Sequence, residues 1–354
     1  YAPSYGLQPL RERWKEEIYQ KNPSLMDKEI SLPVVTQAIT HGLSVVADMW
    51  VDPGDLIFLT DKLWGNYNMI FGVRKGARIL QFPLFDTSGF FNLKGLEASL
   101  EEHKDKAEKL IVLLNFPNNP TGYTPTKSEA QGIVNILLCL AERGKNIVVI
   151  CDDAYFGLVY EEGVLEESIF AYLTGLHERI LAIKLDAATK ENYVWGLRVG
   201  FLTYGTHVRG DQRQFYEALE KKSAGCVRGS ISNASRLSQE IVLRSMGAKS
   251  YYEEKRQRYQ TMKERALLIK EILKDTKYKE NFEAYPFNSG YFMCINVKGV
   301  DAERVRLHLL EKYGVGVISL GSNDIRVAFS CVEKEDLREL FDLINNSIMA
   351  LKAN

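Results

Sequence analysis

The sequence has almost no excess of charge of either sign. Its 354 residues carry 45 basic and 46 acidic side chains, which give a formal net charge of −1 at pH 7. No basic stripe runs along the chain, although nucleic-acid-binding surfaces depend on such stripes. No acidic tail is present that would indicate a disordered interaction arm. We therefore expect no nucleic-acid partner.

Long apolar runs are also lacking. No apolar segment reaches the roughly 20 residues that a membrane-spanning helix needs, and no secretory signal peptide is recognisable. These features predict that the protein has no membrane partner. The chain begins at Tyr1 without a methionine and in the middle of a pattern, so we expect an N-terminal arm to be missing from it.

Cysteine is scarce and irregularly placed. The five cysteines are odd in number and mostly set in apolar runs: Cys139, Cys151, Cys226, Cys294 and Cys331. This pattern is typical of buried free thiols in a reducing compartment and fits neither a disulfide framework nor a zinc cluster. We expect a cytoplasmic globular protein without a metal site.

Short apolar runs alternate with amphipathic segments through the first two thirds of the chain. Leu110–Leu114 and Ile147–Ile150 are typical of buried strands, and the segment from Ser128 to Arg143 between them is typical of a helix. We also expect helices at residues 7–21, 40–51 and 67–75. This alternation predicts an α/β fold with a mostly parallel sheet and helices on both faces.

The pattern changes beyond about Ser230. Long helices follow, then a smaller α+β unit that ends in a helix from Glu333 to Leu351. We expect a large domain at residues 22–245 and a small domain that combines residues 1–21 with residues 246–354.

One lysine lies at the carboxyl end of a predicted strand. The apolar run from Arg179 to Leu185 is followed by Lys190, and Arg198 lies eight residues further on. Ligands bind at the carboxyl ends of strands in open α/β sheets, and a partly desolvated lysine there can act as a nucleophile. A lysine taken alone is more often a solvated loop residue, so its interpretation depends on its neighbours.

Two further strand ends carry polar residues. Asp152 follows the run Ile147–Ile150, and a desolvated carboxylate there would keep a pyridine nitrogen protonated. A helix N-cap is the alternative, and Asp153 offers a second acid for that purpose. Asn119 lies in the turn Asn118–Gly122, where it can donate to a ring hydroxyl or simply form a turn.

Three more residues fit a binding site, each with an ordinary alternative. Thr40 opens a predicted helix, whose first backbone amides suit a phosphate, although it can also be a simple cap. Trp64 can stack on an aromatic ring or belong to the core. Arg326 stands inside an apolar strand, where it would bind a carboxylate or form a structural ion pair.

Taken together, these motifs resemble the fold-type I pyridoxal-phosphate enzymes, in particular the class I/II aminotransferases. The match is carried by Asn119-Pro-Thr-Gly122, Asp152-x-x-Tyr155, and Lys190 with Arg198, in that order along the chain. It covers nearly the whole sequence. It implies a seven-stranded sheet between helices in a large cofactor domain, a smaller α+β domain, and pyridoxal 5′-phosphate as cofactor.

The resemblance also implies roles for individual residues. Lys190 would bond covalently to the cofactor and shuttle the substrate's Cα proton, Asp152 would pair with the ring nitrogen, and Trp64 would stack on the ring. Tyr155 and Asn119 would bind the ring hydroxyl, and Arg326 the substrate α-carboxylate. The phosphate would be held by a set of residues at one helix start and beyond: Ile39, Thr40 and Arg198.

Two implied residues concern the assembly and the substrate. Tyr1 falls where the family has a tyrosine that reaches the neighbouring subunit's phosphate, which implies a homodimer with shared sites. Arg228, five residues before Asn233, resembles the arginine that binds a distal carboxylate in aspartate aminotransferases. A phosphate-side or surface arginine is the alternative for Arg228.

The sequence also departs from the family pattern. Ala187 stands three residues before Lys190, where a serine is common, and Ala38 and Ile39 replace small polar residues or glycine at the helix start. We expect a ping-pong aminotransferase acting on an amino acid and a 2-oxo acid. A lyase or decarboxylase would use the same lysine and aspartate, and a regulatory pyridoxal-phosphate-binding module is a further alternative.

Overall fold

The computed structural model describes residues 1–353, which form two compact units. The first consists of Tyr1–Phe116, Pro125–Gly157 and Leu165–Tyr251, and the second of Pro117–Thr124, Leu158–Val164 and residues 252–353. The predicted assignment of residues 1–21 to the small domain is therefore wrong. These residues contain helix α1 (Gln8–Lys21), whose Trp14 stacks at 3.9 Å on Phe201 of the first unit.

The first unit is built on a seven-stranded sheet in the order β1-β7-β6-β5-β4-β2-β3. Strands β2 to β6 run parallel, whereas β7 is antiparallel to both β1 and β6. The strands are β1 Val34–Thr36, β2 Leu56–Thr60, β3 Arg78–Phe82, β4 Lys109–Asn115, β5 Asn146–Asp152, β6 Ile180–Ala187 and β7 Gly200–Thr206. The predicted α/β fold with a mostly parallel sheet is confirmed.

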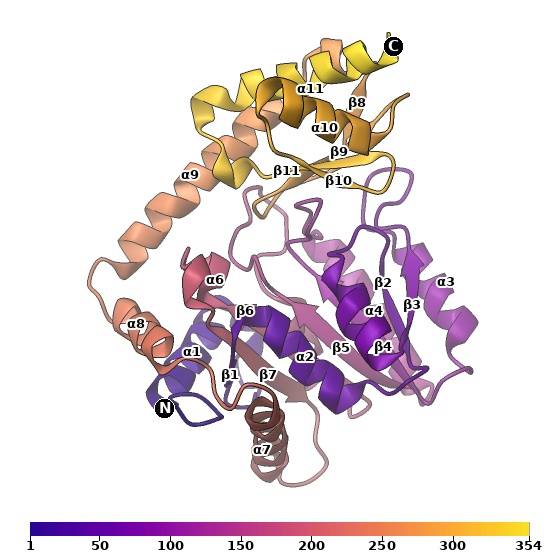
Figure 1. Cartoon of the computed structure of the whole chain (residues 1–354). Helices are drawn as coiled ribbons and strands as arrows, with labels where there is room; N and C mark the ends of the chain where they lie inside the picture. The colour runs from indigo at the N-terminus through magenta and orange to yellow at the C-terminus, as the bar shows by residue number, and fades with distance from the viewer. Residues whose placement is uncertain (354) are drawn as a thin grey trace. The chain divides into compact units, whose positions relative to one another are not determined.

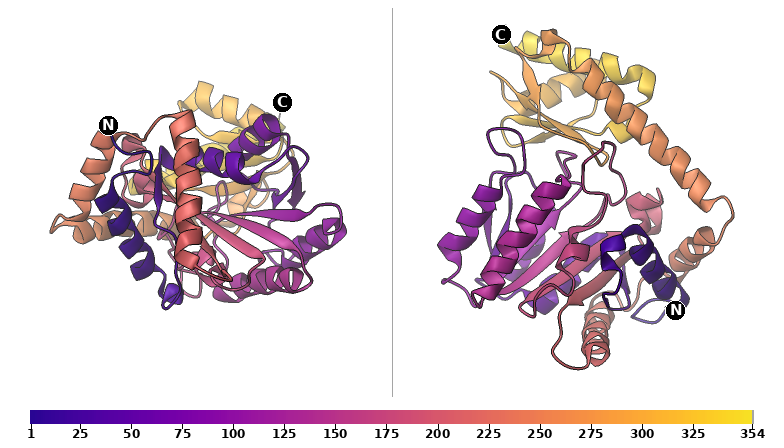
Figure 2. Two further views of the ribbon diagram at one scale, coloured as in Figure 1. Left: turned by 90° about the horizontal axis from the view of Figure 1, so that it is seen from below. Right: turned by 180° about the vertical axis from the view of Figure 1, so that it is seen from behind.

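Helices cover both faces of this sheet (Figures 1 and 2). A Cβ added to Gly42 of α2 would meet Leu185, whereas one added to Gly205 would meet Phe170 of α5. Gly205 pairs with Ala182 of β6, and Ala182 and Leu185 point to opposite faces because strand side chains alternate. Helices α2 and α5 therefore lie on opposite faces of the sheet. The remaining bounds are α2 Ala38–Trp50, α3 Leu93–His103, α4 Lys127–Glu142, α5 Ile169–Leu173, α6 Ala188–Glu191, α7 Gln212–Ser230 and α8 Arg236–Met246.

The central strands form because their residues suit burial on both faces. β5 carries Ile147-Val-Val-Ile150, all buried, as expected for a strand with helices on either side. Helix α4 begins with a capping box, in which Thr126 and Glu129 each bind the other's backbone amide. The helix expected at residues 67–75 is present at residues 66–75, and its middle, Asn68–Val73, is a π-helical segment, a form often found at functional sites.

The second unit contains an antiparallel sheet in the order β10-β11-β9-β8. Its strands are β8 Phe282–Ala284, β9 Met293–Val297, β10 Ile318–Leu320 and β11 Asp324–Val327, and its helices are α9 Tyr251–Ile272, α10 Ala302–Tyr313 and α11 Leu337–Lys352. Helix α10 packs on α11 and on β10. This is the predicted smaller α+β unit.

Candidate active site

Three of the predicted catalytic residues meet at the carboxyl ends of β5 and β6. Asp152 is the last residue of β5, and Lys190 lies just beyond β6. The Lys190 Nζ lies 5.2 Å from the centre of the Tyr155 ring, which is buried. Lys190 lies in the one-turn helix α6, and its backbone carbonyl accepts a 3.1 Å hydrogen bond from the Tyr193 amide.

The Asp152 carboxylate is buried and held in a fixed orientation. One oxygen accepts a 2.6 Å hydrogen bond from the Tyr67 hydroxyl and the other a 3.1 Å bond from the Ala154 amide. Burial raises the pKa of this carboxyl, while the Tyr67 hydrogen bond and the charge of Lys190 act in the opposite direction. A cationic partner would therefore stabilise the ionised form of Asp152.

The Lys190 amine is easier to deprotonate than an ordinary lysine. Burial lowers its pKa, and the charge of Arg198 lowers it further, whereas Asp152 raises it. Asp152 and Arg198 therefore both lie within electrostatic reach of the Lys190 amine. A larger neutral fraction of the amine favours nucleophilic attack on a carbonyl carbon.

Tyr67 is a residue that the sequence analysis missed. It is buried at 1% exposure, and its ring lies 5.6 Å from Trp64 in an edge-to-face arrangement. It therefore links the predicted stacking residue, Trp64, to Asp152. The available signal was a tyrosine three residues after Trp64, because a buried tyrosine hydroxyl needs a polar partner.

A strained backbone corner lies beside these residues. Ala38 and Arg198 both have left-handed conformations, with φ of 58° and 54°, and the Ala38 amide donates to the Arg198 carbonyl at 3.1 Å. Such strain in residues other than glycine concentrates at functional sites. The Arg198 side chain is exposed.

Ile39 and Thr40 lie in the first turn of α2, as the resemblance implies. Contrary to our prediction, Thr40 does not open this helix, and it is not a simple cap either, because α2 begins at Ala38 and its cap residue is Gln37. Near this corner, Thr189 is buried at 2% exposure, and its hydroxyl has no hydrogen-bond partner among residues 1–353. A buried hydroxyl without a partner is the kind of group that an anionic ligand would satisfy.

A second group of predicted residues meets within the second unit. The Arg326 guanidinium donates a 2.9 Å hydrogen bond to the Asn119 side-chain oxygen and lies 4.1 Å from the centre of the Phe292 ring. An arginine stacked on a ring keeps its planar edge oriented, which suits a bidentate contact with a carboxylate.

The remaining two predicted residues, Tyr1 and Arg228, belong to neither group. Tyr1 is fully exposed. Arg228 lies near the end of α7, is exposed, and donates to the Ser232 hydroxyl at 2.9 Å.

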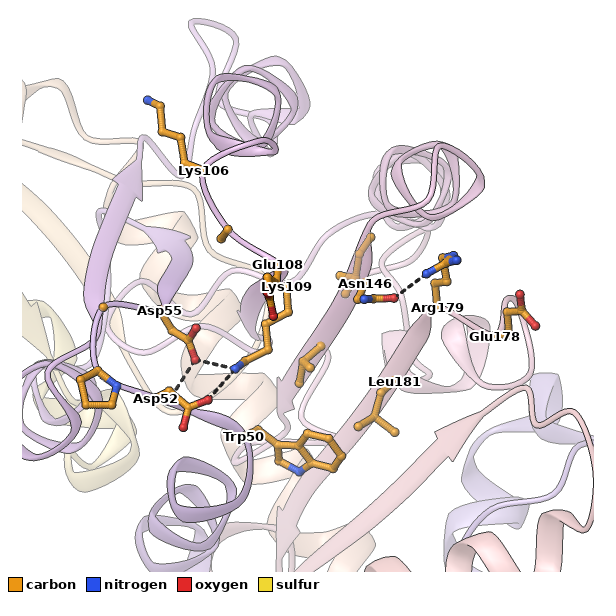
Figure 3. A pocket seen from close by; sticks show the side chains of 15 residues that line it. Trp50, Asp52, Asp55, Lys106, Glu108, Lys109, Asn146, Glu178, Arg179 and Leu181 are labelled. Carbon is orange, nitrogen blue, oxygen red and sulfur yellow. Dashed lines mark hydrogen bonds and ion pairs between the residues drawn. The ribbon is translucent and has the colours of Figure 1, made fainter.

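A surface pocket of about 600 Å³ lies at the amino ends of the strands, opposite the predicted catalytic residues (Figure 3). None of the predicted site residues lines it. Its Lys109 is paired with Asp52 and Asp55, and its Arg179 donates to Asn146. The predicted chemistry thus lies at the strand ends where α/β folds bind ligands, not in this pocket.

The family is decided by a match along almost the whole chain. A sequence model of the family described as aminotransferase class I and II matches residues 1–344. The chain belongs to this family. It is therefore an aminotransferase, an enzyme that transfers nitrogenous groups, as the resemblance in the sequence implied.

Several relatives of this aminotransferase are known. It is 24% identical to an aspartate aminotransferase of Sulfurisphaera tokodaii over 96% of this chain and 80% of the relative. Among solved structures, an aminotransferase of Anaerococcus prevotii matches with a TM-score of 0.84 and 24% identity, over 98% of this chain and 82% of the other. A kynurenine aminotransferase of Pyrococcus horikoshii matches with a TM-score of 0.81 and 20% identity, over 99% and 82%.

Proposed function

We propose that this aminotransferase uses pyridoxal 5′-phosphate and moves an amino group between an amino acid and a 2-oxo acid by ping-pong kinetics. The observation that carries the proposal is the convergence of the Lys190 amine, the Asp152 carboxylate and the Tyr155 ring at the ends of β5 and β6. The kynurenine aminotransferase of Pyrococcus horikoshii was solved in complex with PMP, which supports a B6 cofactor here.

The residues of the site fit this cofactor. The first unit would hold it: Asp152 would pair with the ring nitrogen, and Tyr67 holds that carboxylate in place. The unpartnered Thr189 hydroxyl, the first turn of α2 at Ile39 and Thr40, and Arg198 provide donors for a phosphate. Trp64 and Tyr155 offer aromatic surface in this unit. The family resemblance implies that Asn119, which belongs to the second unit, would donate to the ring hydroxyl.

When bound, pyridoxal phosphate would withdraw electrons from the substrate's Cα and make its proton acidic. The Lys190 amine, with its lowered pKa, would then accept that proton and later donate it. Arg326 would bind the substrate α-carboxylate, because Asn119 and the Phe292 ring already orient its guanidinium.

A spectroscopic half-reaction tests the proposal. The protein loaded with pyridoxal phosphate should absorb visible light, and an amino acid added without a 2-oxo acid should release one 2-oxo acid per chain and then stop. Lys190→Ala should lower kcat by at least about 10²–10⁴-fold, because the proton carrier is lost. Lys249→Ala, at an exposed lysine, is the matched control.

Three results would contradict the proposal: a wild-type protein that stays colourless with the cofactor, ternary-complex kinetics, or continuous release of ammonia. The last result would indicate a lyase instead.

An acidic amino acid is the substrate class we favour. The relative from Sulfurisphaera tokodaii is an aspartate aminotransferase. Within residues 1–353, the exposed Arg228 guanidinium has one hydrogen-bond partner, the neutral Ser232 hydroxyl. Arg228→Ala should lower kcat/KM for aspartate by about 10–100-fold, as expected when a charged hydrogen bond is lost. The value of kcat/KM for leucine should stay the same. Steady-state assays with both substrates measure this, with Arg213→Ala at the other end of α7 as control. Equal losses on both substrates would remove the acidic-substrate proposal.

The assembly and location follow the same family comparison. We infer a homodimer with shared active sites, in which Tyr1 reaches the neighbouring phosphate; its full exposure in the single chain supports this. We also infer a cytoplasmic location, supported by the five cysteines, all free. None of the described helices combines the length and apolar character that a membrane span requires.

A further inference from the structure

One lysine and two aspartates are buried together on one face of the first unit's sheet. The Lys184 side chain is 1% exposed, and those of Asp153 and Asp186 are 6% and 2% exposed. The Lys184 ammonium contacts the Asp153 carboxylate directly and lies 3.3 Å from an Asp186 oxygen. We call these three residues the Lys184 cluster.

The Lys184 cluster does not belong to the site already described. Lys184 pairs with Cys151 across the sheet, and Asp152 pairs with Leu185. Because side chains alternate along a strand, Lys184 and Asp152 point to opposite faces. The cluster's partners are on its own face: Ser168 donates to Asp153 at 2.6 Å, and Phe156 lies 4.4 Å from the ammonium.

Stability alone does not explain such a cluster. Removing charges from water is costly, and apolar residues of similar volume often stabilise a fold equally well or better than a buried ion pair. A buried polar network that is fully bonded does, however, select one arrangement of the segments that it joins. The role of the Lys184 cluster therefore depends on which segments of the chain it joins.

The cluster joins the two segments that carry the predicted catalytic groups. Asp153 directly follows Asp152 at the end of β5, and Asp186 stands four residues before Lys190 at the end of β6. The Lys184 ammonium forms ion pairs with both Asp153 and Asp186. The segments are also neighbours in the sheet, since the Asp153 amide donates to the Leu185 carbonyl at 2.8 Å.

Helix α1 holds the lysine segment at two further points. Before Lys190, the Trp14 indole donates to Asp186 at 3.1 Å. After it, Glu191 forms an ion pair with Lys21 of the same helix. Lys190 thus lies between two anchors on α1, one of which is a member of the Lys184 cluster.

We propose that the Lys184 cluster is a positioning device, which sets the orientation of the Lys190 amine relative to the Asp152 carboxylate from the far face of the sheet. Its residues touch neither cofactor nor substrate. The proposal rests on the proposed function, because it concerns how a ring held between Lys190 and Asp152 is oriented.

The test is visible circular dichroism of the protein loaded with pyridoxal phosphate. The free cofactor is achiral, so the ellipticity of its visible band reports how the protein fixes the ring. The neutral variant Lys184→Met/Asp153→Asn/Asp186→Asn should bind the cofactor covalently but lose at least about half of this ellipticity. Its kcat should fall by about 10–100-fold, as expected for a small displacement of reacting groups, with KM little changed.

A matched control is the buried pair Arg11–Glu220, which joins α1 to α7 at 2.8 Å with 6% and 13% exposure. Arg11→Met/Glu220→Gln should shift the melting temperature but keep the ellipticity and kcat. A folded cluster variant with wild-type ellipticity and kcat would overturn the proposal.

If the triple variant does not fold, the visible ellipticity of the single variant Asp186→Asn tests the proposal. This variant keeps the Asp153–Lys184 ion pair and an acceptor for the Trp14 indole. Reduced ellipticity supports the positioning role, and unchanged ellipticity overturns it. A wild-type protein without a visible band would instead overturn the proposed function, and this inference with it.

Discussion

The adjacent residues Asp152 and Asp153 have different environments. Asp152 accepts from the Tyr67 hydroxyl on one face of the sheet, whereas Asp153 contacts the Lys184 ammonium on the other. Burial raises the pKa of both carboxyls, that of Asp153 to about 6. The two carboxylates of the Lys184 cluster outweigh the effect of burial on Lys184 and raise its pKa, so the ammonium stays charged at neutral pH.

At the residue scale, the lowered pKa of Lys190 predicts a cost in stability. The amine has an ordinary pKa of 10.5 when unfolded and a lower one when folded. Below the folded pKa the buried charge therefore destabilises the apoprotein. As pH rises from the folded pKa to 10.5 this cost disappears, because the unfolded chain then binds more protons than the fold.

Replacing Lys190 by methionine should therefore stabilise the apoprotein at pH 7, with a melting temperature about 1–2 °C higher for each 1 kcal/mol gained in a chain of this length. The advantage should shrink as pH approaches 10.5. Thermal unfolding from pH 7 to pH 10.5 measures it, with Lys249→Met as the exposed control. A variant less stable than wild type at pH 7 would contradict the lowered pKa.

At the scale of elements, the start of α2 and the start of β7 constrain each other. A Cβ on Gly200 would lie 2.6 Å from the Ala38 carbonyl carbon, which is backbone and has to move. Ala38 itself has φ of 58°, a conformation that costs roughly 1–2 kcal/mol in a residue with a side chain. The strained backbone at Ala38, beside the proposed phosphate site, therefore lowers the stability of the protein.

Opposite effects are expected from two substitutions in this corner. Gly200→Ala should destabilise the protein by about 1–3 kcal/mol, as overpacking does, and weaken cofactor binding. Ala38→Gly should be neutral or stabilising by up to about 1 kcal/mol, because glycine adopts this φ freely. Chemical unfolding and cofactor titration measure both.

A control for these substitutions is Ala130→Gly within α4, which should cost about 1 kcal/mol or more. If Ala38→Gly destabilised as much as Ala130→Gly, the backbone at Ala38 would not be strained.

At the scale of the whole molecule, helix α8 offers a surface for the inferred dimer. Leu237 and Ile241 are four residues apart, so they share one helical face, and they are 72% and 42% exposed. Exposed apolar faces of this kind mark association surfaces more often than isolated apolar residues do.

If the proposed dimer shares its sites, Leu237→Glu/Ile241→Glu should convert it to a monomer and lower the affinity for pyridoxal phosphate by at least about 10-fold. Sedimentation velocity and cofactor titration measure these effects. Leu310→Glu, at a half-exposed leucine of α10, is the control and should change neither. A wild-type protein that sediments as a monomer would contradict the dimer.

Much of the fold and of the site could be read from local patterns in the sequence. The run Ile147–Ile150 lies in β5, and the helix expected at Ser128–Arg143 is α4 at Lys127–Glu142. Burial and backbone preference act over a few residues, so such runs locate strands and helices without knowledge of their neighbours. The same holds for Lys190 and Asp152, because each follows an apolar run that could be recognised as a strand.

Only the tertiary structure decided which side chains meet. The Tyr67–Asp152 bond spans 85 residues of sequence and the Trp14–Asp186 bond 172, so neither had a local signal. The packing of α1 on the first unit and the left-handed start of α2 likewise depend on partners remote in sequence. The sequence by itself determined the strands and the chemical groups at their ends; strand register and long-range packing determined the face and the partners of each group.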